Sequence, residues 1–338
     1  MKLIILSALV VMASCLPPTP DDIENEWQKF KSEFRGSNGF QAMADEPKRR
    51  QVFETNYKTI VSHNDEADKG IHTYRMGVNQ FADWTDEEFQ QKMLSLHMKP
   101  LTDVHNLTQY VRNTNSKKII PPNQDWTSKE SRIKNQGSCG SCFAFASVDT
   151  IESHYTINTG NKIELSPQNI VDCLYRSDVC QTGGSLAEAY NLVKKNGGIM
   201  AESDYPYEGE YGTCSYKPYL SKVTVSGYEG LDNGDEVALK EMVSKGPVAL
   251  GIDASLKSFK LYSSGVYVDN TCHNPMNHGV VAAGYGVTSD GQEYWLIKNS
   301  WDKTWGEAGY MKMARNNDNQ CGIGLHCLTP TGVTAVSH

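Results

Sequence analysis

The sequence has no cysteine between residues 16 and 138, although the chain of 338 residues contains nine. If a leader that includes Cys15 is removed, the other eight cysteines all lie beyond residue 138. Cysteine pairing is typical of secreted proteins. The uneven distribution therefore predicts two segments with different fates.

Long apolar runs, basic stripes and internal repeats are also absent. The apolar run at residues 3–13 follows Met1-Lys2, is too short to cross a bilayer, and is typical of a signal peptide cleaved near residues 14–16. A formal net charge of -8 argues against a nucleic-acid partner. We therefore expect a signal peptide at residues 1–15, a secretory-pathway protein that is lysosomal or extracellular, and no membrane span.

The region after the leader has helical periodicity. Apolar residues at 23, 27, 30 and 34 predict one helix, which Gly36 and residues 38–39 end. A second helix carries a stripe formed by Asp45, Arg49, Phe53, Asn56, Ile60 and Asn64. Its polar members fit either a partly solvated helix or side chains that pair within a small domain. Alternation over residues 77–83 predicts a short strand, and residues 86–96 a further helix.

Residues 97–119 are polar and predict an exposed linker that is open to proteolysis. Within it, Asn106-Leu107-Thr108 is the only standard glycosylation sequon of the chain, with Asn106 as the acceptor.

Cys142 follows a glycine-containing loop and opens an apolar helical run that residues 158–160 end. At a helix N-terminus the macrodipole and unpaired N–H groups stabilise a thiolate, so we expect a lowered thiol pKa and a reactive sulfur. The neighbouring Cys139 leaves other interpretations open at this point: a redox pair, half of a zinc site or one end of a disulfide.

A nucleophilic cysteine needs a base and a group that orients the base. His278 opens an apolar strand over residues 278–285, and Asn299 ends another over residues 293–298. Trp301 could shield a hydrogen bond between them from water. Strands are also expected at 248–252 and 309–313, after helices that follow Cys142 and span 186–193. Helices followed by strands predict an α+β fold with a cleft between the halves.

The surrounding motifs resemble the papain family of cysteine peptidases. The motifs are Gln-Gly-x-Cys-Gly-Ser-Cys at 136–142, Asn-His-Gly at 277–279, Lys-Asn-Ser-Trp at 298–301 and Trp-Gly-Glu-Ala-Gly-Tyr at 305–310. The polar helical stripe is similar to the inhibitory-propeptide motif of cathepsin L-like zymogens. A second propeptide signature is matched by Gly77, Asn79, Phe81 and Asp83.

The resemblance implies a papain-like two-lobed α+β fold, with a mainly helical N-terminal lobe and a β-barrel-like C-terminal lobe, behind a small helical inhibitory prodomain. It implies an inhibitory propeptide at residues 16–119, here called the prosegment, and a mature peptidase at 120–338. The implied enzyme is an endopeptidase that needs no metal or other cofactor. Its partners would be protein or peptide substrates, its own prosegment and cystatin-like inhibitors, and it would be a monomer.

The resemblance also assigns residues. Cys142 is the nucleophile, His278 the acid and base, Asn299 orients the ring, and Gln136 with the Cys142 N–H forms the oxyanion hole. Disulfides are implied for Cys139–Cys180, Cys173–Cys214 and Cys272–Cys321, which leaves Cys327 either buried and inert or paired with another molecule. Substrate-binding positions are Gly183, Gly184, Ser185, Leu186, Gly251, Met276, Gly279, Trp301 and His326.

At the pocket for the second residue before the scissile bond, His326 suggests a charge change, because an unperturbed imidazole titrates near pH 6.5. The hypothesis is that protonated His326 admits polar or acidic residues and disfavours basic ones at low pH. The alternative is a neutral ring that shortens the pocket or turns to solvent.

The sequence departs from the family pattern at four places, one of which is a shortened loop between Trp126 and Gln136. Phe143 replaces the usual Trp, Asp45 replaces Glu with Glu46 as a neighbour that could compensate, and residues 180–184 are one residue longer than usual. A thioredoxin-like oxidoreductase would need a strand just before Cys139, and a zinc module would need a second close pair. A catalytically weak homologue with a binding or regulatory role would usually lack Cys142, His278 or Asn299.

Overall fold

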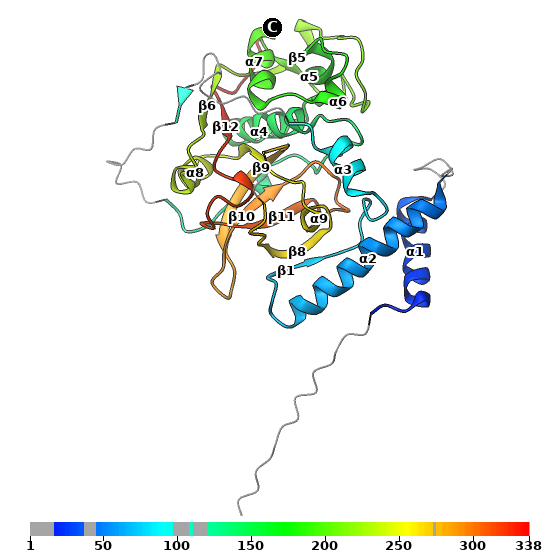
Figure 1. Ribbon diagram of the computed structural model, residues 1–338. Coiled ribbons are helices and arrows are strands. Elements are labelled where there is room, and N and C mark those ends of the chain that lie inside the picture. Colours follow the sequence, from blue (N-terminus) through cyan, green and yellow to red (C-terminus); the bar gives the residue numbers. More distant parts are fainter. Residues whose placement is uncertain (1–16, 37–44, 97–107, 111–119, 273–274, 338) are drawn as a thin grey trace, which may run out of the picture.

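The computed structural model describes residues 17–36, 45–96, 108–110, 120–272 and 275–337 (Figure 1). The expected signal peptide and the sequon residue Asn106 lie outside these ranges. None of the helices in the described ranges is long and apolar enough to cross a membrane.

Two predicted helices of the prosegment are confirmed. Helix α1 (Pro20–Phe34) begins at Thr19, which forms a capping box with Asp22, and α2 is Glu46–Asp68. Both pack on a small core that contains Trp27, Phe30 and Phe53. In Figure 1 the two helices lie against one side of the remaining molecule.

The polar side chains of the α2 stripe pair within the prosegment, as the second interpretation stated. Asn56 Nδ2 donates to Ala82 O at 2.9 Å and to Trp84 O at 3.3 Å. Asn64 exchanges two hydrogen bonds with the Met76 backbone, of 2.9 and 3.0 Å. Asn56 thus binds turn backbone and Asn64 the backbone at the end of β1, and these polar groups would otherwise be buried without a partner, which is why these stripe positions are not apolar.

Asp45, the first member of the stripe, behaves differently. It is exposed, and its carboxylate lies 3.9 Å from Lys48, while Glu46 contacts Lys31 at 2.7 Å. Arg49 instead binds Glu88 through two hydrogen bonds, of 2.6 and 2.5 Å. Compensation by Glu46 at Arg49 is therefore wrong, because Glu88 supplies that carboxylate.

The strand predicted at residues 77–83 is wrong. The strand β1 is Tyr74–Met76, and the residues that follow form turns. Asn79 Oδ1 accepts the Phe81 N–H at 3.0 Å, and its Nδ2 donates to Lys260 O at 2.9 Å. A side chain that bonds its own backbone two residues on favours a turn over a strand.

The helix predicted at 86–96 is shorter than expected. Helix α3 (Asp86–Met93) ends where Leu94 becomes extended, with φ -116° and ψ 97°. In the predicted linker, β2 (Thr108–Gln109) pairs in parallel with β6 (Gly227–Leu231). The local sequence does not predict β2, because this strand forms by pairing with β6, which is distant in the chain.

The remaining chain is α+β, as predicted. Its helices are α4 (Cys142–Thr159), α5 (Pro167–Cys173), α6 (Val179–Thr182), α7 (Leu186–Asn196), α8 (Glu236–Val243) and α9 (Lys257–Lys260), with short 3-10 helices at Thr127–Lys129, Pro218–Leu220 and Gln320–Gly322. Its other strands are β3 (Gln124–Asp125), β4 (Ile199–Met200), β5 (Ser221–Thr224), β7 (Val248–Ile252), β8 (Tyr262–Tyr267), β9 (His278–Val287), β10 (Glu293–Lys298), β11 (Tyr310–Ala314), β12 (Cys327–Thr331) and β13 (Thr334–Ala335).

One large sheet dominates this part. Ten strands form it, nine of them in the order β1-β8-β11-β10-β9-β7-β12-β6-β2, with β3 beside β9, and a small sheet has the order β13-β5-β4. In Figure 1, α4 lies between this sheet and the helices α5–α7. Prosegment residues Phe81, Trp84 and Phe89 share a core with Phe259 and Trp301, so prosegment and sheet are packed as one unit.

Candidate active site

Cys142 lies at the first position of α4, in the interior of the molecule. The sequence predicted a helix that begins at Cys142 and that residues 158–160 end. In the structure Ser141 is the N-cap residue, and Gly160 ends the helix with φ 79°. The preceding loop is held by the Gly140 N–H, which donates to Cys180 O at 2.8 Å. The thiol is thus directed from a helix N-terminus, the position that favours an anion.

His278 begins β9, directly beside the start of α4. A Cβ added to the next residue, Gly279, would lie 3.1 Å from the Cys142 carbonyl oxygen, so β9 passes this close only because position 279 has no side chain. His278 Nε2 lies 2.9 Å from Asn299 Oδ1. Trp301 stacks on the imidazole with 4.5 Å between ring centroids, which covers the His278–Asn299 hydrogen bond as the sequence suggested.

The hydrogen bond to Asn299 determines which ring nitrogen is free. Asn299 Oδ1 also accepts the Ser300 N–H at 2.8 Å, so this oxygen acts as an acceptor and His278 Nε2 carries the proton. Nδ1 is buried and has no hydrogen-bond partner in the described parts of the chain. An unprotonated, unpartnered Nδ1 can take a proton from a nearby thiol.

Gln136 is tied to the same strand end. Ser300 Oγ donates to Gln136 Oε1 at 2.7 Å, and the Gln136 N–H donates to Ser300 O at 2.9 Å. With its oxygen occupied, the side chain presents its NH2 group, which lies 3.2 Å from Cys139 O and 3.5 Å from Met93 O. In the covered site these donors thus face two backbone carbonyls, one of them from the prosegment residue Met93.

The prosegment residues that follow α3 cover this site. Ser95 Oγ donates to Gly140 O at 2.8 Å, and the Leu96 N–H donates to Asn277 O at 2.9 Å. Ser95 lies so close to Gly183 that a Cβ on that glycine would be 1.6 Å from Ser95 O. Leu96 is buried in the core of the helical lobe. Ser95 and Leu96, which lie outside any helix or strand, thus occupy the space in front of Cys142.

The prediction of a lowered thiol pKa is wrong for this covered state. Burial raises the pKa of Cys142 to about 11, although the N–H groups of Gly279 and Ser95 oppose the shift. Burial also lowers the pKa of His278 to about 4, although the hydrogen bond that His278 donates to Asn299 Oδ1 opposes this shift. Burial destabilises the charged forms of both groups, and for the thiolate this effect is larger than the stabilisation by the helix N-terminus. Both groups are therefore neutral in the proform.

Three predicted substrate-binding positions lie side by side on adjacent strands. The Gly251 N–H donates to His326 O at 2.9 Å, and Gly251 is the register partner of Gly279, which contacts Cys142. His326, Gly251 and Gly279 thus lie in this order across the sheet, and Gly279 is the one next to Cys142.

His326 is 3% exposed, and burial lowers its pKa to about 4. The predicted titration near pH 6.5 is therefore wrong for the proform, and the ring does not turn to solvent. Of the alternatives given for His326, the structure agrees with a neutral ring that is buried in the interior.

The other predicted positions flank Cys142. A Cβ on Gly184 would lie 2.7 Å from the Phe143 ring, so the aromatic residue that replaces Trp packs directly under the glycine pair. Ser185 caps α7, while Leu186 is fully buried in the helical core and offers little surface to a ligand. Met276 is half-buried, against the backbone of Gly322.

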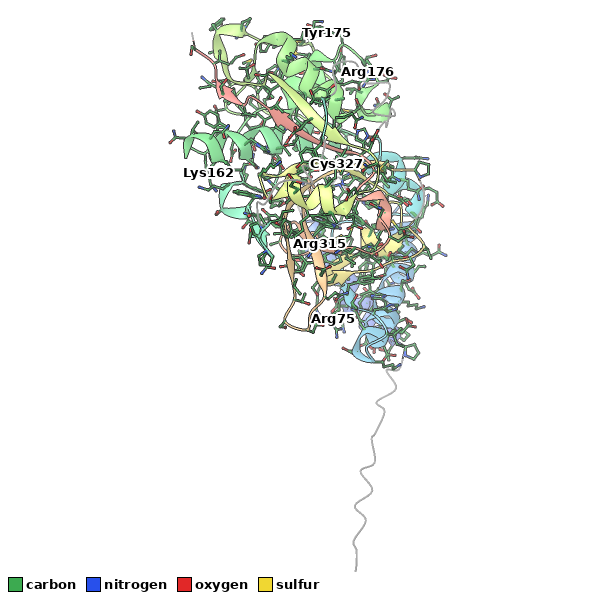
Figure 2. All side chains as sticks on the ribbon, turned by 90° about the vertical axis from the view of Figure 1, so that its left-hand side faces the viewer. Arg75, Lys162, Tyr175, Arg176, Arg315 and Cys327 are labelled. Atoms are coloured by element: carbon green, nitrogen blue, oxygen red, sulfur yellow. A yellow bond between two sulfur atoms is a disulfide. The ribbon has the colours of Figure 1, made fainter. Side chains whose placement is uncertain are left out.

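The disulfides join Cys139–Cys180, Cys173–Cys214 and Cys272–Cys321, the same pairs that the resemblance implies. Cys327 is free and fully buried in the interior (Figure 2), with its sulfur 3.4 Å from Ile323 O. Its position supports the inert interpretation rather than pairing with another molecule.

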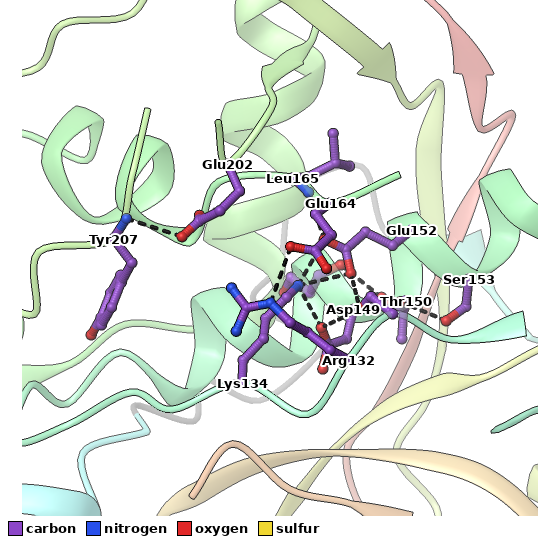
Figure 3. Close-up of polar contacts among 12 residues, drawn as sticks. Arg132, Lys134, Asp149, Thr150, Glu152, Ser153, Glu164, Leu165, Glu202 and Tyr207 are labelled. Atoms are coloured by element: carbon purple, nitrogen blue, oxygen red, sulfur yellow. Dashed lines mark hydrogen bonds and ion pairs between the residues drawn. The ribbon is translucent and has the colours of Figure 1, made fainter. Parts of the chain in front are cut away.

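Sequence reasoning missed a buried charged cluster beneath the site (Figure 3). Lys134 Nζ lies 2.7 Å from both Asp149 and Glu152 of α4, and Lys298 Nζ lies 3.1 Å from Asp149. All four side chains are at most 4% exposed. Burial alone would raise the pKa of Asp149, but the two lysines hold it below its ordinary value.

The cluster connects the segments that carry the candidate catalytic residues. Lys298 directly precedes Asn299, Lys134 lies two positions before Gln136, and Asp149 is on the helix that begins at Cys142. A signal was present in the sequence, because Asp149 and Glu152 are three apart and next to the apolar positions Val148 and Ile151, and buried carboxylates require cations as partners.

Known proteins share both parts of this architecture. Residues 120–331 match the papain family cysteine protease domain, and residues 27–89 match the cathepsin propeptide inhibitor domain (I29). Cathepsin S of Mus musculus is 42% identical over 321 residues, which cover 93% of this chain and 91% of the relative. Cathepsin K of Mus musculus is 39% identical, with 93% and 95% covered.

A solved structure agrees over both parts. The digestive procathepsin L2 proteinase from the Tenebrio molitor larval midgut superposes with a TM-score of 0.84 at 38% identity, and covers 91% of this chain and 99% of its own. The chain therefore belongs to the papain family of cysteine proteases, as the proenzyme of a cysteine-type endopeptidase that carries its own inhibitory propeptide.

Proposed function

We propose that the protein is a secreted or lysosomal endopeptidase that cleaves peptide bonds through Cys142, His278 and Asn299 and a covalent acyl-enzyme. The observation that carries this proposal is the 2.9 Å hydrogen bond between His278 and Asn299 beside the N-terminus of α4. It leaves Nδ1 of the imidazole free to exchange a proton with the thiol. Cystatin-like inhibitors and a monomeric state are predictions that accompany the proposal.

Departure of the prosegment would prepare the nucleophile. Burial is the main cause of both the raised pKa of Cys142 and the lowered pKa of His278, and Ser95 contributes to that burial. When water replaces the prosegment, the two values move toward each other. The proton then passes from Sγ to Nδ1, and a thiolate–imidazolium pair forms at the positive end of α4.

Bond cleavage follows from this pair. The thiolate attacks the peptide carbonyl carbon, and the charge that develops on oxygen is stabilised by the Gln136 NH2 group and the Cys142 N–H. The imidazolium gives its Nδ1 proton to the leaving amine, and the C–N bond breaks. Water then attacks the thioester with His278 as base, the C–S bond breaks, and the acid product leaves.

A direct experiment tests this proposal. Purified proenzyme is incubated at mildly acidic pH with a peptide amide substrate, with and without a thiol alkylator. Hydrolysis that the alkylator blocks supports the proposal, and hydrolysis that survives complete alkylation contradicts it.

We expect acid to weaken the hold of the prosegment, through particular carboxylates. Burial raises the pKa of Asp83, so protonation of Asp83 does not weaken the folded prosegment. Glu88 differs, because Arg49 and Thr85 outweigh burial and lower its pKa from about 4.5. Its stabilisation is complete above that value and is lost as the pH falls through the lowered one.

Activation should produce a new N-terminus within a few residues of Ile120, at the proposed boundary between residues 16–119 and 120–338. A cut further on would disrupt sheet pairing, since the Trp126 N–H donates to Ala283 O at 2.9 Å and its indole N–H to Val243 O at 2.7 Å. N-terminal sequencing of acid-activated enzyme checks this expectation. An active form that starts beyond Trp126 would contradict it.

For the subsite at His326 we expect no charge change above about pH 5. Because the pKa of His326 is lowered to about 4, the ring stays neutral in that range. We compare kcat/KM for substrates with Glu and with Leu at the second residue before the scissile bond. The ratio of these two values should then be the same at about pH 5 and at about pH 7.5. A preference for Glu that rises on acidification in the wild type and not in His326→Ala would restore the protonated-histidine hypothesis.

A further inference from the structure

Two histidine rings of the prosegment stack on each other near the catalytic domain. His63 on α2 is 8% exposed, and its ring centroid lies 4.1 Å from that of His72, with 11° between the ring planes. His63 Nε2 lies 3.1 Å from Tyr74 O. Since a carbonyl oxygen only accepts, Nε2 carries the proton, and the neutral ring satisfies this contact.

Tyr74 belongs to β1, one of two prosegment strands that pair with the catalytic domain, the other being β2. Strand β1 pairs with β8, with Tyr74 opposite Gly265, and the Tyr74 ring lies 4.9 Å from that of Tyr267. Just before it, Thr73 O accepts the Val266 N–H at 3.1 Å. His63 therefore contacts the strand β1, which pairs with β8 of the catalytic domain, so a change in the charge of His63 affects this pairing.

The charged groups around the two rings come from three elements. On α2, Glu66 lies 2.8 Å from His72 Nε2. From the catalytic domain, Asp269 is close enough to act on His63, although Ser258 Oγ already donates to it at 2.7 Å. On β1, Arg75, at the prosegment end of the molecule in Figure 2, pairs with Asp68.

These groups do not all act in the same direction. Burial lowers the pKa of His63 below its ordinary 6.5, and His72 adds to this effect. Tyr74 O, Glu66 and Asp269 oppose the shift without overcoming it. The docked prosegment thus holds His63 in its neutral form.

We propose that His63, stacked on His72, is an acid sensor of the prosegment, in which protonation of His63 loosens β1 from β8 and starts release of the prosegment. This inference rests on the proposed acid activation of the proenzyme. A charge on the buried His63 ring would lie 4.1 Å from the His72 ring, and Glu66 lies against His72 rather than His63.

The direction of the pH effect follows from the docked and released states. In a released prosegment the hydrated His63 ring has its ordinary pKa of about 6.5. The docked state is therefore most stable above that pH, and loses stability as the pH falls toward the lowered value. Glu88 weakens the prosegment only below about pH 4.5, so His63 provides the response at milder acidity.

The test compares self-processing rates of full-length proenzymes between about pH 7.5 and pH 4. His63→Gln keeps an amide that can donate to Tyr74 O but cannot titrate, and His72→Gln removes only the second ring. Lys58→Gln, exposed on the same helix, is the matched control. We expect His63→Gln to process about fivefold more slowly than wild type near pH 5.5 and no faster at pH 7.5. His72→Gln should be intermediate, and Lys58→Gln should match wild type.

A structural role gives a different result. If His63→Gln is faster at every pH, including pH 7.5, or has the pH profile of wild type, the proposal is overturned. Full-length Cys142→Ala protein gives a direct readout, because the His63 ring should titrate below pH 6.5 by NMR, and a midpoint at or above 6.5 also overturns it. If wild type shows no acid dependence at all, the proposed acid activation fails as well, which separates the two failures.

Discussion

Proenzyme with Cys142→Ala should hydrolyse no peptide amide substrate and should keep its prosegment at acid pH when no active enzyme is added. The thiol supplies the bond-forming atom, and His278 and Gln136 cannot replace it. Loss of a catalytic nucleophile lowers kcat by a factor on the order of 10^6. Initial rates with a fluorogenic peptide amide and gel analysis of the proform measure the two effects.

The second free cysteine provides the control for this variant. Cys327 is as buried as Cys142 but lies against Ile323 O, away from His278. Cys327→Ala should therefore retain wild-type kcat/KM after processing. If Cys142→Ala still cleaves substrate and is still blocked by an alkylator, another thiol is the nucleophile and the assignment fails.

Replacing Lys134 by Met should destabilise the catalytic domain by about 3–5 kcal/mol. The substitution leaves Asp149 and Glu152, both almost completely buried, with Lys298 as the remaining cation of the cluster. Buried charges that lose their partner cannot recover hydration, so the cost is much larger than that of a surface pair. Denaturant unfolding of the full-length protein in the Cys142→Ala background measures this free energy.

Arg132→Met is the matched control, because Arg132 lies two residues away and pairs with Glu164 at 3.1 Å on the surface, where the two side chains are 53% and 44% exposed. An exposed pair contributes at most about 1 kcal/mol. Equal losses for the two variants would show that burial does not determine the contribution of Lys134. We also expect a lower kcat for Lys134→Met. Lys134 and Lys298 are close in the chain to Gln136 and Asn299, so their ion pairs fix the positions of these two residues.

The sequence by itself determined the elements whose pattern is local. Spacing of apolar residues predicted α1, α4 and α7, and a mixed polar and apolar stripe predicted α2, because side chains that recur every three to four residues share one face of a helix. Strand ends identified His278 and Asn299 as side chains at one edge of a sheet. The polar stripe of α2 left two interpretations, and only the positions of Ala82, Trp84 and Met76 decided that Asn56 and Asn64 pair with the backbone of other prosegment residues.

Tertiary structure decided what depends on partners distant in the chain. Residues 77–83 alternate like a strand, but Asn79 bonds its own backbone and Lys260 and makes them turn. Lys134 and Lys298 look like ordinary surface residues until folding brings both to Asp149. The pKa of Cys142 reversed direction for the same reason. A helix N-terminus is a local feature, whereas the burial that outweighs it is produced by segments, Ser95 among them, that reach the thiol only in the folded proenzyme.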